Sequence, residues 1–337
     1  MYLLSFETSC DDTSVALMRD IELISMSTRT QLEHSVTWGV VPEVAARSHA
    51  NAIFPCIEDV LSGGHISLAD IDVIACTEKP GLLPSLLTGM TVAKTLALSL
   101  AKPIVWIDHI ESHIFANYLG RSEADIVYPA VVLTVSWGHT EIYLWKSMYE
   151  LEMIWETRDD AAGEAFDKVS KMMWLGFPGG AHIARLAQIY RESWIVNRDS
   201  ETRLFPEVML ERDSLDFSFS GIKTAVKREI DHEMIRVGFL SEIFTQYIAY
   251  EFEETVTDIL TKKLLRAVDH TGVETMFLAG WVSANTVLKN KLQKFADVRG
   301  IRFLAPIKNL YSMDNAAMIG IRAYYELQKN NHIEKFS

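Results

Sequence analysis

The chain has 337 residues, of which 49% are hydrophobic and 23% are charged. This length exceeds one small core and fits two α/β lobes, because domains commonly contain about 100 to 200 residues. The net charge of -13 excludes a protein that binds nucleic acid through its overall field, and the odd number of cysteines, three, excludes a disulfide framework.

Two β-hairpins are predicted, one in each half of the chain. The first covers residues 2–18 and turns at ETSCDDT, and the second covers residues 129–145 and turns at WGHT. Both turns are polar, whereas the flanking strands are apolar. This weak internal similarity predicts a duplicated α/β lobe.

Helices and strands alternate along the rest of the chain. We expect strands at IDVIACT, PIVWI and ETMFLA. We expect helices over 42–64, 81–101, 163–173 and about 222–270, a helix that holds His109 and His113, and helices from Ala284 and from Asn315. This alternation favours parallel sheets over an all-helical or an all-β fold.

The longest apolar stretch runs from Leu82 to Ile107. Lys94, Lys102 and two prolines interrupt it, so a buried helix and a strand explain it better than a membrane span. The N-terminus has neither a basic leader nor a small-residue cleavage site. We therefore expect a cytoplasmic protein with no membrane segment.

Two basic clusters at helical spacing stand out in this acidic chain. They consist of Lys262, Lys263 and Arg266, and of Lys289, Lys291 and Lys294. We interpret each as a solvated helix face.

His109 and His113 lie four residues apart in DHIESHIFANYL, so on a helix both imidazoles project from one face and can share a metal. In a chain with ten histidines this spacing often arises by chance, so the pair needs a third ligand. Two histidines and one carboxylate would leave positions open for substrate, as in catalytic sites. Ile110 follows His109, so the base of a metalloprotease is missing.

Four turns are suited to an anionic ligand, because they expose backbone N–H groups and glycine lets a phosphate or ribose approach closely. They are ETSCDDTS, TVSWGHT, GFPGG and FLAGWVSAN. Together they predict a nucleotide-binding cleft between two lobes.

Four acids, Asp159, Asp160, Glu164 and Asp167, lie in or before the helix that begins near Gly163. We interpret Asp159 and Asp160 as charges favourable to the helix dipole. Asp167 lies a full turn inside the helix and faces the glycine-rich stretch, so it is the better candidate for binding substrate hydroxyls.

Nine motifs together resemble the TsaD family, also called Gcp, which contains the tRNA threonylcarbamoyladenosine synthases. The resemblance runs in the family's order from about Leu3 to Gly320, and the DDAAGEAFDK segment points to the bacterial and organellar branch. The motifs are FETSCDDTSVAL, HSVTWGVVPEVAARSH, IDHIESH, TVSWGHTEIY, DDAAGEAFDKVSKM, GFPGG, FSFSGIKTAV, AGWVSAN and SMDNAAMIG.

The resemblance implies a two-lobed actin-like or Hsp70-like ATPase fold with an interlobe nucleotide cleft. It places one lobe at 1–118 plus 315–337 and the other, with helical insertions, at 119–314. It supplies Asp314 as the third ligand of one divalent metal, iron or zinc, beside His109 and His113. The family's substrate-binding positions fall on Thr134, Val135, Ser136, Trp137, Gly138, Asp167, Gly180 and Asn285.

The implied reaction moves a threonylcarbamoyl group from threonylcarbamoyl-AMP to N6 of adenosine 37 in tRNAs that read codons starting with A, and AMP leaves. Glu7, Asp11 and Asp12 line the first hairpin and are candidates for a general base or for handling the nucleotide. The implied partners are tRNA, a TsaB-like paralogue and a TsaE-like ATPase, and ATP or ADP would act through a partner.

Six of the eight tryptophans sit where the family pattern has glycine. A bulky group at a packed site costs about 1 to 3 kcal/mol, so one repeated substitution calls for one cause. Our hypothesis is that UGA codons, read here as tryptophan, are decoded as glycine in the source organism. The positions are Trp38, Trp106, Trp137, Trp155, Trp174 and Trp281.

Two other interpretations remain open from the sequence. An ATP-dependent small-molecule kinase of the same superfamily would share the hairpins and the cleft but would not need the His, His and Asp set. A degenerate family member that acts as a non-catalytic assembly subunit would explain the tryptophans.

Overall fold

The structure is a computed structural model, and it describes residues 1–31, 33–34, 39–193, 203–206, 215–329 and 333–334. The chain forms two compact units, Met1–Ile126 with Pro306–Ser337, and Val127–Ala305. The lobe boundaries expected from the sequence lie after residues 118 and 314. Trp38 and Trp194 lie outside the described residues.

The first unit is built on a six-stranded sheet in the order β11-β5-β4-β1-β2-β3. Strands β1, β2 and β3 form an antiparallel meander, and β4 and β5 add to β1 in parallel. The bounds are β1 Tyr2–Glu7, β2 Asp12–Arg19, β3 Glu22–Thr30, β4 Val73–Lys79, β5 Ile104–Asp108 and β11 Ile333–Glu334.

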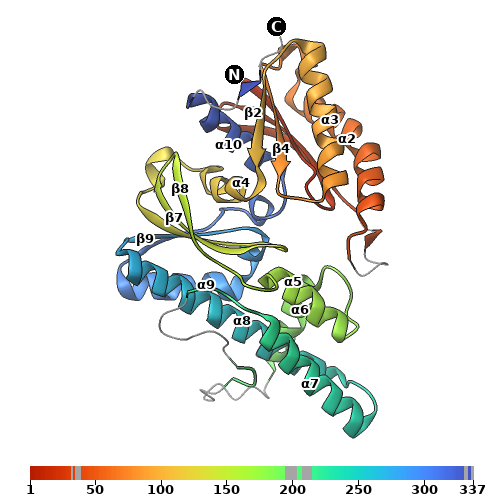
Figure 1. The fold of residues 1–337 in the computed structure, drawn as a ribbon, viewed down its shortest axis with the longest axis vertical. Helices are drawn as coiled ribbons and strands as arrows, with labels where there is room; N and C mark the ends of the chain where they lie inside the picture. Colours follow the sequence, from red (N-terminus) through yellow and green to blue (C-terminus); the bar gives the residue numbers. More distant parts are fainter. Residues whose placement is uncertain (32, 35–38, 194–202, 207–214, 330–332, 335–337) are drawn as a thin grey trace. The chain divides into compact units, whose positions relative to one another are not determined.

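Four α-helices accompany this sheet: α2 (Pro42–Gly64), α3 (Leu83–Leu100), α4 (His109–Phe115) and α10 (Ala316–Gln328). Helices α2 and α3 lie side by side next to β2 and β4 (Figure 1). Their apolar residues join those of β1, β2 and β4 in one core. Helix α10 contacts β1, β2 and α4, so strand β1 is buried along nearly its whole length.

Helix α3 is the helix among the described residues that is long and apolar enough to cross a membrane, judged by length and composition alone. It lies within the apolar stretch that the sequence assigns to a buried helix and a strand. Its buried positions include Leu86, Gly89 and Ala93, and it contacts α2 and β4. One side of the helix is therefore packed inside the first unit, whereas Leu83, Leu87 and Leu98 of the same helix are exposed.

The second unit repeats the strand order of the first. Its five-stranded sheet runs β10-β9-β6-β7-β8, with β6, β7 and β8 antiparallel and with β9 and β10 parallel to β6. The duplication predicted from the two hairpins is confirmed. The bounds are β6 Ala130–Val135, β7 Thr140–Ser147, β8 Glu150–Glu156, β9 Thr275–Ala279 and β10 Arg302–Leu304.

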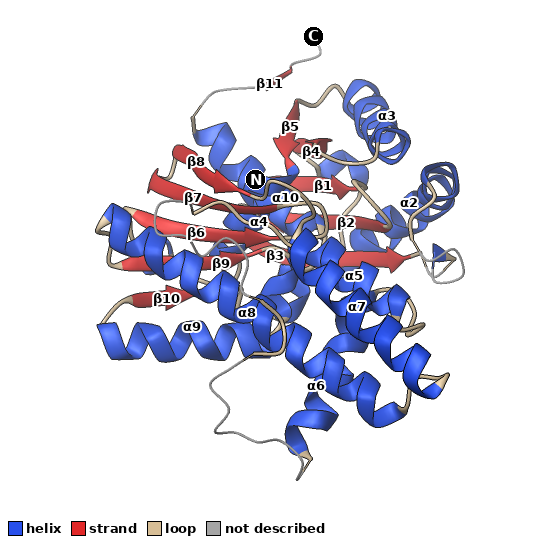
Figure 2. Ribbon diagram, turned by 60° about the horizontal axis from the view of Figure 1, so that its bottom comes forward, coloured by secondary structure: helices blue, strands red, loops and turns tan. Residues whose placement is uncertain are grey.

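Five α-helices belong to the second unit: α5 (Ala162–Met172), α6 (Gly179–Glu192), α7 (Ser220–Val237), α8 (Glu242–Thr271) and α9 (Thr286–Arg299). Helices α8 and α9 contact each other and lie over β6 and β10, respectively (Figure 2). Helix α8 is buried over much of its length, so it forms the centre of this helical layer.

Strands β3 and β8 and helix α6 are absent from the sequence prediction. Both strands are mostly half-buried or exposed, so their sequences mix charged and apolar residues instead of forming an apolar run. Helix α6 begins at Gly179 and Gly180, a pair that signals a turn when it is read without its surroundings.

Trp174 lies at the C-terminus of α5 with a left-handed backbone, φ +55°. The N–H of Trp174 donates to Lys171 O at 3.1 Å, and the N–H of Leu175 donates to Ser170 O at 3.0 Å. This is the Schellman arrangement, in which glycine is the usual residue at the left-handed position. The backbone at this site therefore favours glycine on physical grounds alone.

We expect the Trp174→Gly protein to be more stable than the Trp174→Ala protein by about 1 kcal/mol, because only alanine carries the Cβ that disfavours a left-handed backbone. The two variants lose the same indole, so their difference isolates the backbone effect. Chemical denaturation followed by far-UV circular dichroism measures it. An alanine variant as stable as the glycine variant would contradict the conclusion that the left-handed backbone at this position favours glycine.

Candidate metal centre and ligand-binding turns

The side chains of His109, His113 and Asp314 converge within the first unit. One ligand atom from each lies within 4.8 Å of the others. Asp314 Oδ1 is 3.1 Å from His113 Nε2 and 3.6 Å from His109 Nε2. The grouping expected from the resemblance is therefore present in the structure.

Two helix N-termini hold these ligands in place. Asp108 ends β5 and caps α4, accepting hydrogen bonds from the N–H groups of Ile110 and Glu111 at 2.9 and 3.1 Å. This cap fixes the first turn of α4, which starts at His109. Asn315 caps α10 through Met318 N at 3.0 Å, so Asp314 directly precedes a fixed helix start.

Glu7 orients the first ligand from behind. Its Oε2 atom lies 2.9 Å from His109 Nδ1 and accepts a hydrogen bond from Thr77 Oγ1 at 2.6 Å. The Ser9 N–H donates to Oε1 at 2.5 Å. A carboxylate on Nδ1 selects the tautomer in which Nε2 is free to bind a metal, as in many metal sites.

The surroundings of His113 fit a metal ligand. This side chain is fully buried, and among the described residues neither ring nitrogen has a hydrogen bond of good geometry, although Nε2 lies 3.1 Å from Asp314 Oδ1. Its ring meets that of His109 edge-on, with centroids 4.7 Å apart. A buried imidazole without a hydrogen bond is costly, and a cation bound to Nε2 would remove that cost.

The charges of the histidines and carboxylates at the centre shift one another's pKa values. Burial would lower the pKa of His109, but the carboxylates of Glu7 and Asp314 outweigh it and raise the pKa to about 9. Burial would raise the pKa of Asp314, but His109 and His113 lower it to about 2. The carboxylates are therefore held in their ionised form, and His109 would release its proton when a metal binds to Nε2.

Asp12 and Asp11 differ from Glu7 in their environments. Burial, reinforced by Asp314 and other acids, raises the pKa of Asp12 to about 7, and its buried Oδ1 atom has no hydrogen-bond partner among the described residues. Burial and Asp314 also raise the pKa of Asp11. Glu7 is engaged with His109, which lowers its pKa against the effect of burial. Glu7 thus has the contacts of a positioning group, whereas the pKa values of Asp11 and Asp12 are raised.

The segment from Thr134 to Gly138 lies in the second unit, at the end of β6. The Ser136 N–H donates to His139 O at 2.8 Å, which closes the turn before β7. Thr134 pairs with Ala279 of the parallel strand β9, so the turn after β6 lies beside the turn after β9. The carboxyl ends of neighbouring parallel strands are where α/β folds bind ligands.

Gly280 lets these two turns approach each other. Its φ is +81°, and a Cβ atom built on it would lie 2.4 Å from Val135 O. Only glycine fits this contact, because any larger residue would collide with the backbone of β6. The glycine therefore sets the distance between the two turns.

Asp167 faces the glycine-rich stretch, as the sequence predicts. Its Oδ1 atom accepts from Gly179 N at 2.6 Å, and its Oδ2 atom accepts from the indole N–H of Trp137 at 2.8 Å. A Cβ atom on Gly180 would lie 2.8 Å from the Trp281 ring. Two indoles therefore occupy the space beside Asp167 and Gly180.

The other described tryptophans of the set of six behave differently. Trp155 meets the His270 ring edge-on at 5.3 Å, and Trp106 packs against the core of the first unit. Trp174 combines a left-handed backbone with 64% exposure. The geometry thus favours glycine most directly at Trp174 and, through crowding of the ligand turns, at Trp137 and Trp281.

Asn285 is held through both ends of its carboxamide. Its Oδ1 atom caps α9 by accepting from Leu288 N at 2.9 Å, and its Nδ2 atom donates to Glu253 Oε1 at 2.8 Å. Glu253 was not singled out from the sequence. A carboxylate within the mostly buried stretch of α8 was the signal that could have marked it.

Two surface interpretations are wrong. Asp159 is not a charge at the N-terminus of α5. It accepts hydrogen bonds from the hydroxyls of Ser218 and Ser220 and from the Phe219 N–H near the start of α7. Lys263 is fully buried, and Lys291 is bonded to Asp258. Their helix faces are therefore not solvated at these positions, since tertiary packing covers them.

Comparison with known proteins settles the family. The profile of the TsaD family, described as tRNA N6-adenosine threonylcarbamoyltransferase, matches residues 22–321. The chain belongs to this family. It is accordingly a transferase that modifies tRNA, which sets the kinase interpretation aside.

Curated relatives agree over nearly the whole length. The chain is 40% identical to the tRNA N6-adenosine threonylcarbamoyltransferase of Staphylococcus epidermidis over 328 residues, covering 97% of this chain and 92% of the relative. It is 39% identical to the enzyme of the same name from Staphylococcus aureus strain Newman, with the same coverage.

Solved structures with low sequence identity share the fold. Full-length HypF superposes with a TM-score of 0.57 at 12% identity, covering 98% of this chain and 46% of HypF. Component A of the Acidaminococcus fermentans (R)-2-hydroxyglutaryl-CoA dehydratase gives 0.52 at 13% identity, covering 97% and 99%. These likenesses confirm the α/β fold of the actin-like and Hsp70-like ATPases.

We predict that His113→Ala abolishes stoichiometric metal binding and that Glu7→Gln weakens it about 10- to 100-fold, because Glu7 orients a ligand without binding the ion itself. Metal content after dialysis and chelator competition measure both effects.

Glu111→Gln is the matched control for this test. Glu111 lies on α4 between the two histidines but bonds to Arg322 at 2.8 Å. Its variant should keep the metal. Full metal occupancy in His113→Ala would refute the assignment of the centre.

Proposed function

We propose that the protein transfers the threonylcarbamoyl group of threonylcarbamoyl-AMP to N6 of adenosine 37 in tRNAs that read codons starting with A, and releases AMP. The observation that carries the proposal is the grouping of His109, His113 and Asp314 in a chain of the TsaD family. A kinase of this fold has no need for that grouping.

The donor set favours iron or zinc as the metal. Two imidazoles and one carboxylate are typical of non-haem iron sites and of catalytic zinc sites. When bound, such an ion supplies a Lewis acid and a template for the carboxylate and carbonyl oxygens of the substrate. Glu7 keeps His109 in the tautomer that allows binding.

The chain itself would recognise the adenylate through the turns of the second unit. The backbone N–H group of Gly138 follows β6 and can donate to an anionic or carbonyl oxygen. The Asp167 carboxylate can accept hydrogen bonds from ribose hydroxyls. In the chain as written, the Trp137 indole already donates to that carboxylate.

The transfer forms a bond between adenine N6 and the carbamoyl carbon and breaks the bond from that carbon to the phosphate oxygen of AMP. The amine loses one proton in this step. The candidates for the acceptor of this proton are Glu7, Asp11 and Asp12 of the first hairpin.

The acceptor base must leave its stack in the tRNA to react, and an acidic chain has little charge with which to bind RNA alone. We therefore propose that a TsaB-like paralogue and a TsaE-like ATPase complete the machinery in the cytoplasm. ATP or ADP would act through that ATPase.

Two versions of the protein test the function together with the codon hypothesis. One carries tryptophan and the other glycine at the six positions, and each is mixed with threonylcarbamoyl-AMP, tRNA and the two partners. We expect the modified nucleoside from the glycine version only, because Trp137 and Trp281 crowd the ligand turns. Chromatography of the digested tRNA with mass detection measures it.

Asp314→Ala in the glycine version is the control and should yield no product. Product from neither version would remove the enzymatic assignment. Codons that read UGG at the six positions in the source gene would remove the decoding hypothesis.

A further inference from the structure

We propose that Glu253 is a positioning residue for substrate binding, because its buried carboxylate fixes the carboxamide of Asn285 so that one N–H points to an oxygen of the adenylate. This inference rests on the function proposed above and deepens it. It assigns a role to a residue outside the expected substrate-binding positions.

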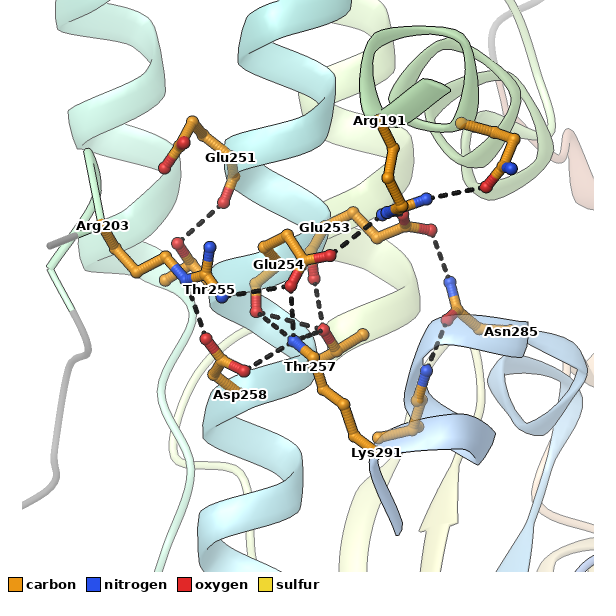
Figure 3. A network of polar contacts seen from close by, with 12 residues as sticks. Arg191, Arg203, Glu251, Glu253, Glu254, Thr255, Thr257, Asp258, Asn285 and Lys291 are labelled. Atoms are coloured by element: carbon orange, nitrogen blue, oxygen red, sulfur yellow. Dashed lines mark hydrogen bonds and ion pairs between the residues drawn. The ribbon is translucent and has the colours of Figure 1, made fainter. Parts of the chain in front are cut away.

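Glu253 lies in the middle of α8 and is only 1% exposed. Its Oε1 atom accepts from Asn285 Nδ2 at 2.8 Å, and its Oε2 atom accepts from Arg191 at 2.7 Å (Figure 3). Burying a charge is costly unless it is paired and hydrogen-bonded, and here both oxygens are engaged. An apolar residue would pack at lower cost, so the carboxylate has a directional role.

The two bonds of Asn285 decide which way its amide faces. Oδ1 is held by Leu288 N at the start of α9, and one Nδ2 hydrogen is held by Glu253. An amide nitrogen carries two hydrogens, so the second is left with a fixed direction. The site thus offers a donor, which selects an oxygen acceptor such as a ribose hydroxyl, a phosphate or a carbonyl.

Arg191 links the same carboxylate to another ligand segment. It lies in the last turn of α6, the helix that begins at Gly179 and Gly180 beside Asp167. Glu253 therefore ties the end of α6 and the start of α9 to one point on α8. The start of α9 follows the turn after β9, and the opposite end of α6, at Gly179, is the end that contacts Asp167.

The neighbouring acid Glu254 has a different set of partners. It bonds to Arg191 at 3.0 Å, to Arg203 at 3.1 Å and to Lys291 at 2.8 Å (Figure 3). Among the described contacts, Asn285 is bonded to Glu253 and not to Glu254. Glu254 therefore provides a control of equal size and charge, nearly as buried, on the same helix.

The test compares Glu253→Gln with Glu254→Gln. Both substitutions are made in the glycine version of the protein, and the partners are present. Glu253→Gln replaces a charge-assisted hydrogen bond to Asn285 by a weaker neutral one, so we expect the KM for threonylcarbamoyl-AMP to rise about 10-fold or more. The kcat should change less than KM. Glu254→Gln should lower the melting temperature similarly and leave KM unchanged.

A second variant keeps the test decisive if Glu253→Gln does not fold. Asn285→Asp keeps the oxygen that caps α9 but removes both amide hydrogens and faces Glu253 with like charge. We expect the same rise in KM. Adding Glu253→Gln to an Asn285→Ala background should have no further effect on KM, because the group that it orients is gone.

Equal KM values for the Glu253→Gln and Glu254→Gln proteins would overturn the inference, as would a normal KM in Asn285→Asp. The dissociation constant for AMP, measured by calorimetry, separates this failure from failure of the proposed function. One outcome is that the protein with Glu253 intact makes no product while Glu253→Gln still weakens AMP binding. In that case the positioning role holds and the transfer assignment fails.

Discussion

The bond between the Glu7 carboxylate and His109 Nδ1 is the contact on which the metal centre depends. At 2.9 Å it joins the end of β1 to the start of α4, which are about a hundred residues apart in the chain. It fixes the tautomer and the direction of one ligand, and Asp314 approaches from the segment before α10. Without the bond from Glu7, the His109 ring would not be held with its Nε2 atom directed to the same point as that of His113.

The second unit solves a comparable problem with backbone geometry. Parallel pairing of β6 and β9 places the ends of both strands at one edge, and Gly280 lets their turns meet. Asp167 accepts a hydrogen bond from Gly179 at the start of α6. Asn285, which follows the turn after β9, is held by Glu253 of α8. The indoles of Trp137 and Trp281 lie beside Asp167 and Gly180, at the positions proposed for substrate binding.

The sequence by itself determined the duplicated α/β hairpins, most of the helices and the family, and it marked the candidate metal ligands. Apolar runs and helix starts are local signals, and His109 and His113 are on one helix face. Asp314 was reached only through resemblance, because no local pattern links residues two hundred positions apart. The same resemblance indicates that six tryptophans stand at glycine positions of the family, and this needs no knowledge of their backbone conformation.

Only the tertiary structure decided the rest. It showed that Lys263 is buried and that Lys291 is bonded to Asp258, although both were expected on solvated faces. It also showed that Asp159 accepts hydrogen bonds at the start of α7 and that Trp174 has a left-handed backbone. It also revealed Glu253 behind Asn285. The physical reason is the same in each case: periodicity describes which side of a helix is apolar, whereas the partner of a buried charge is set by segments that meet only after folding.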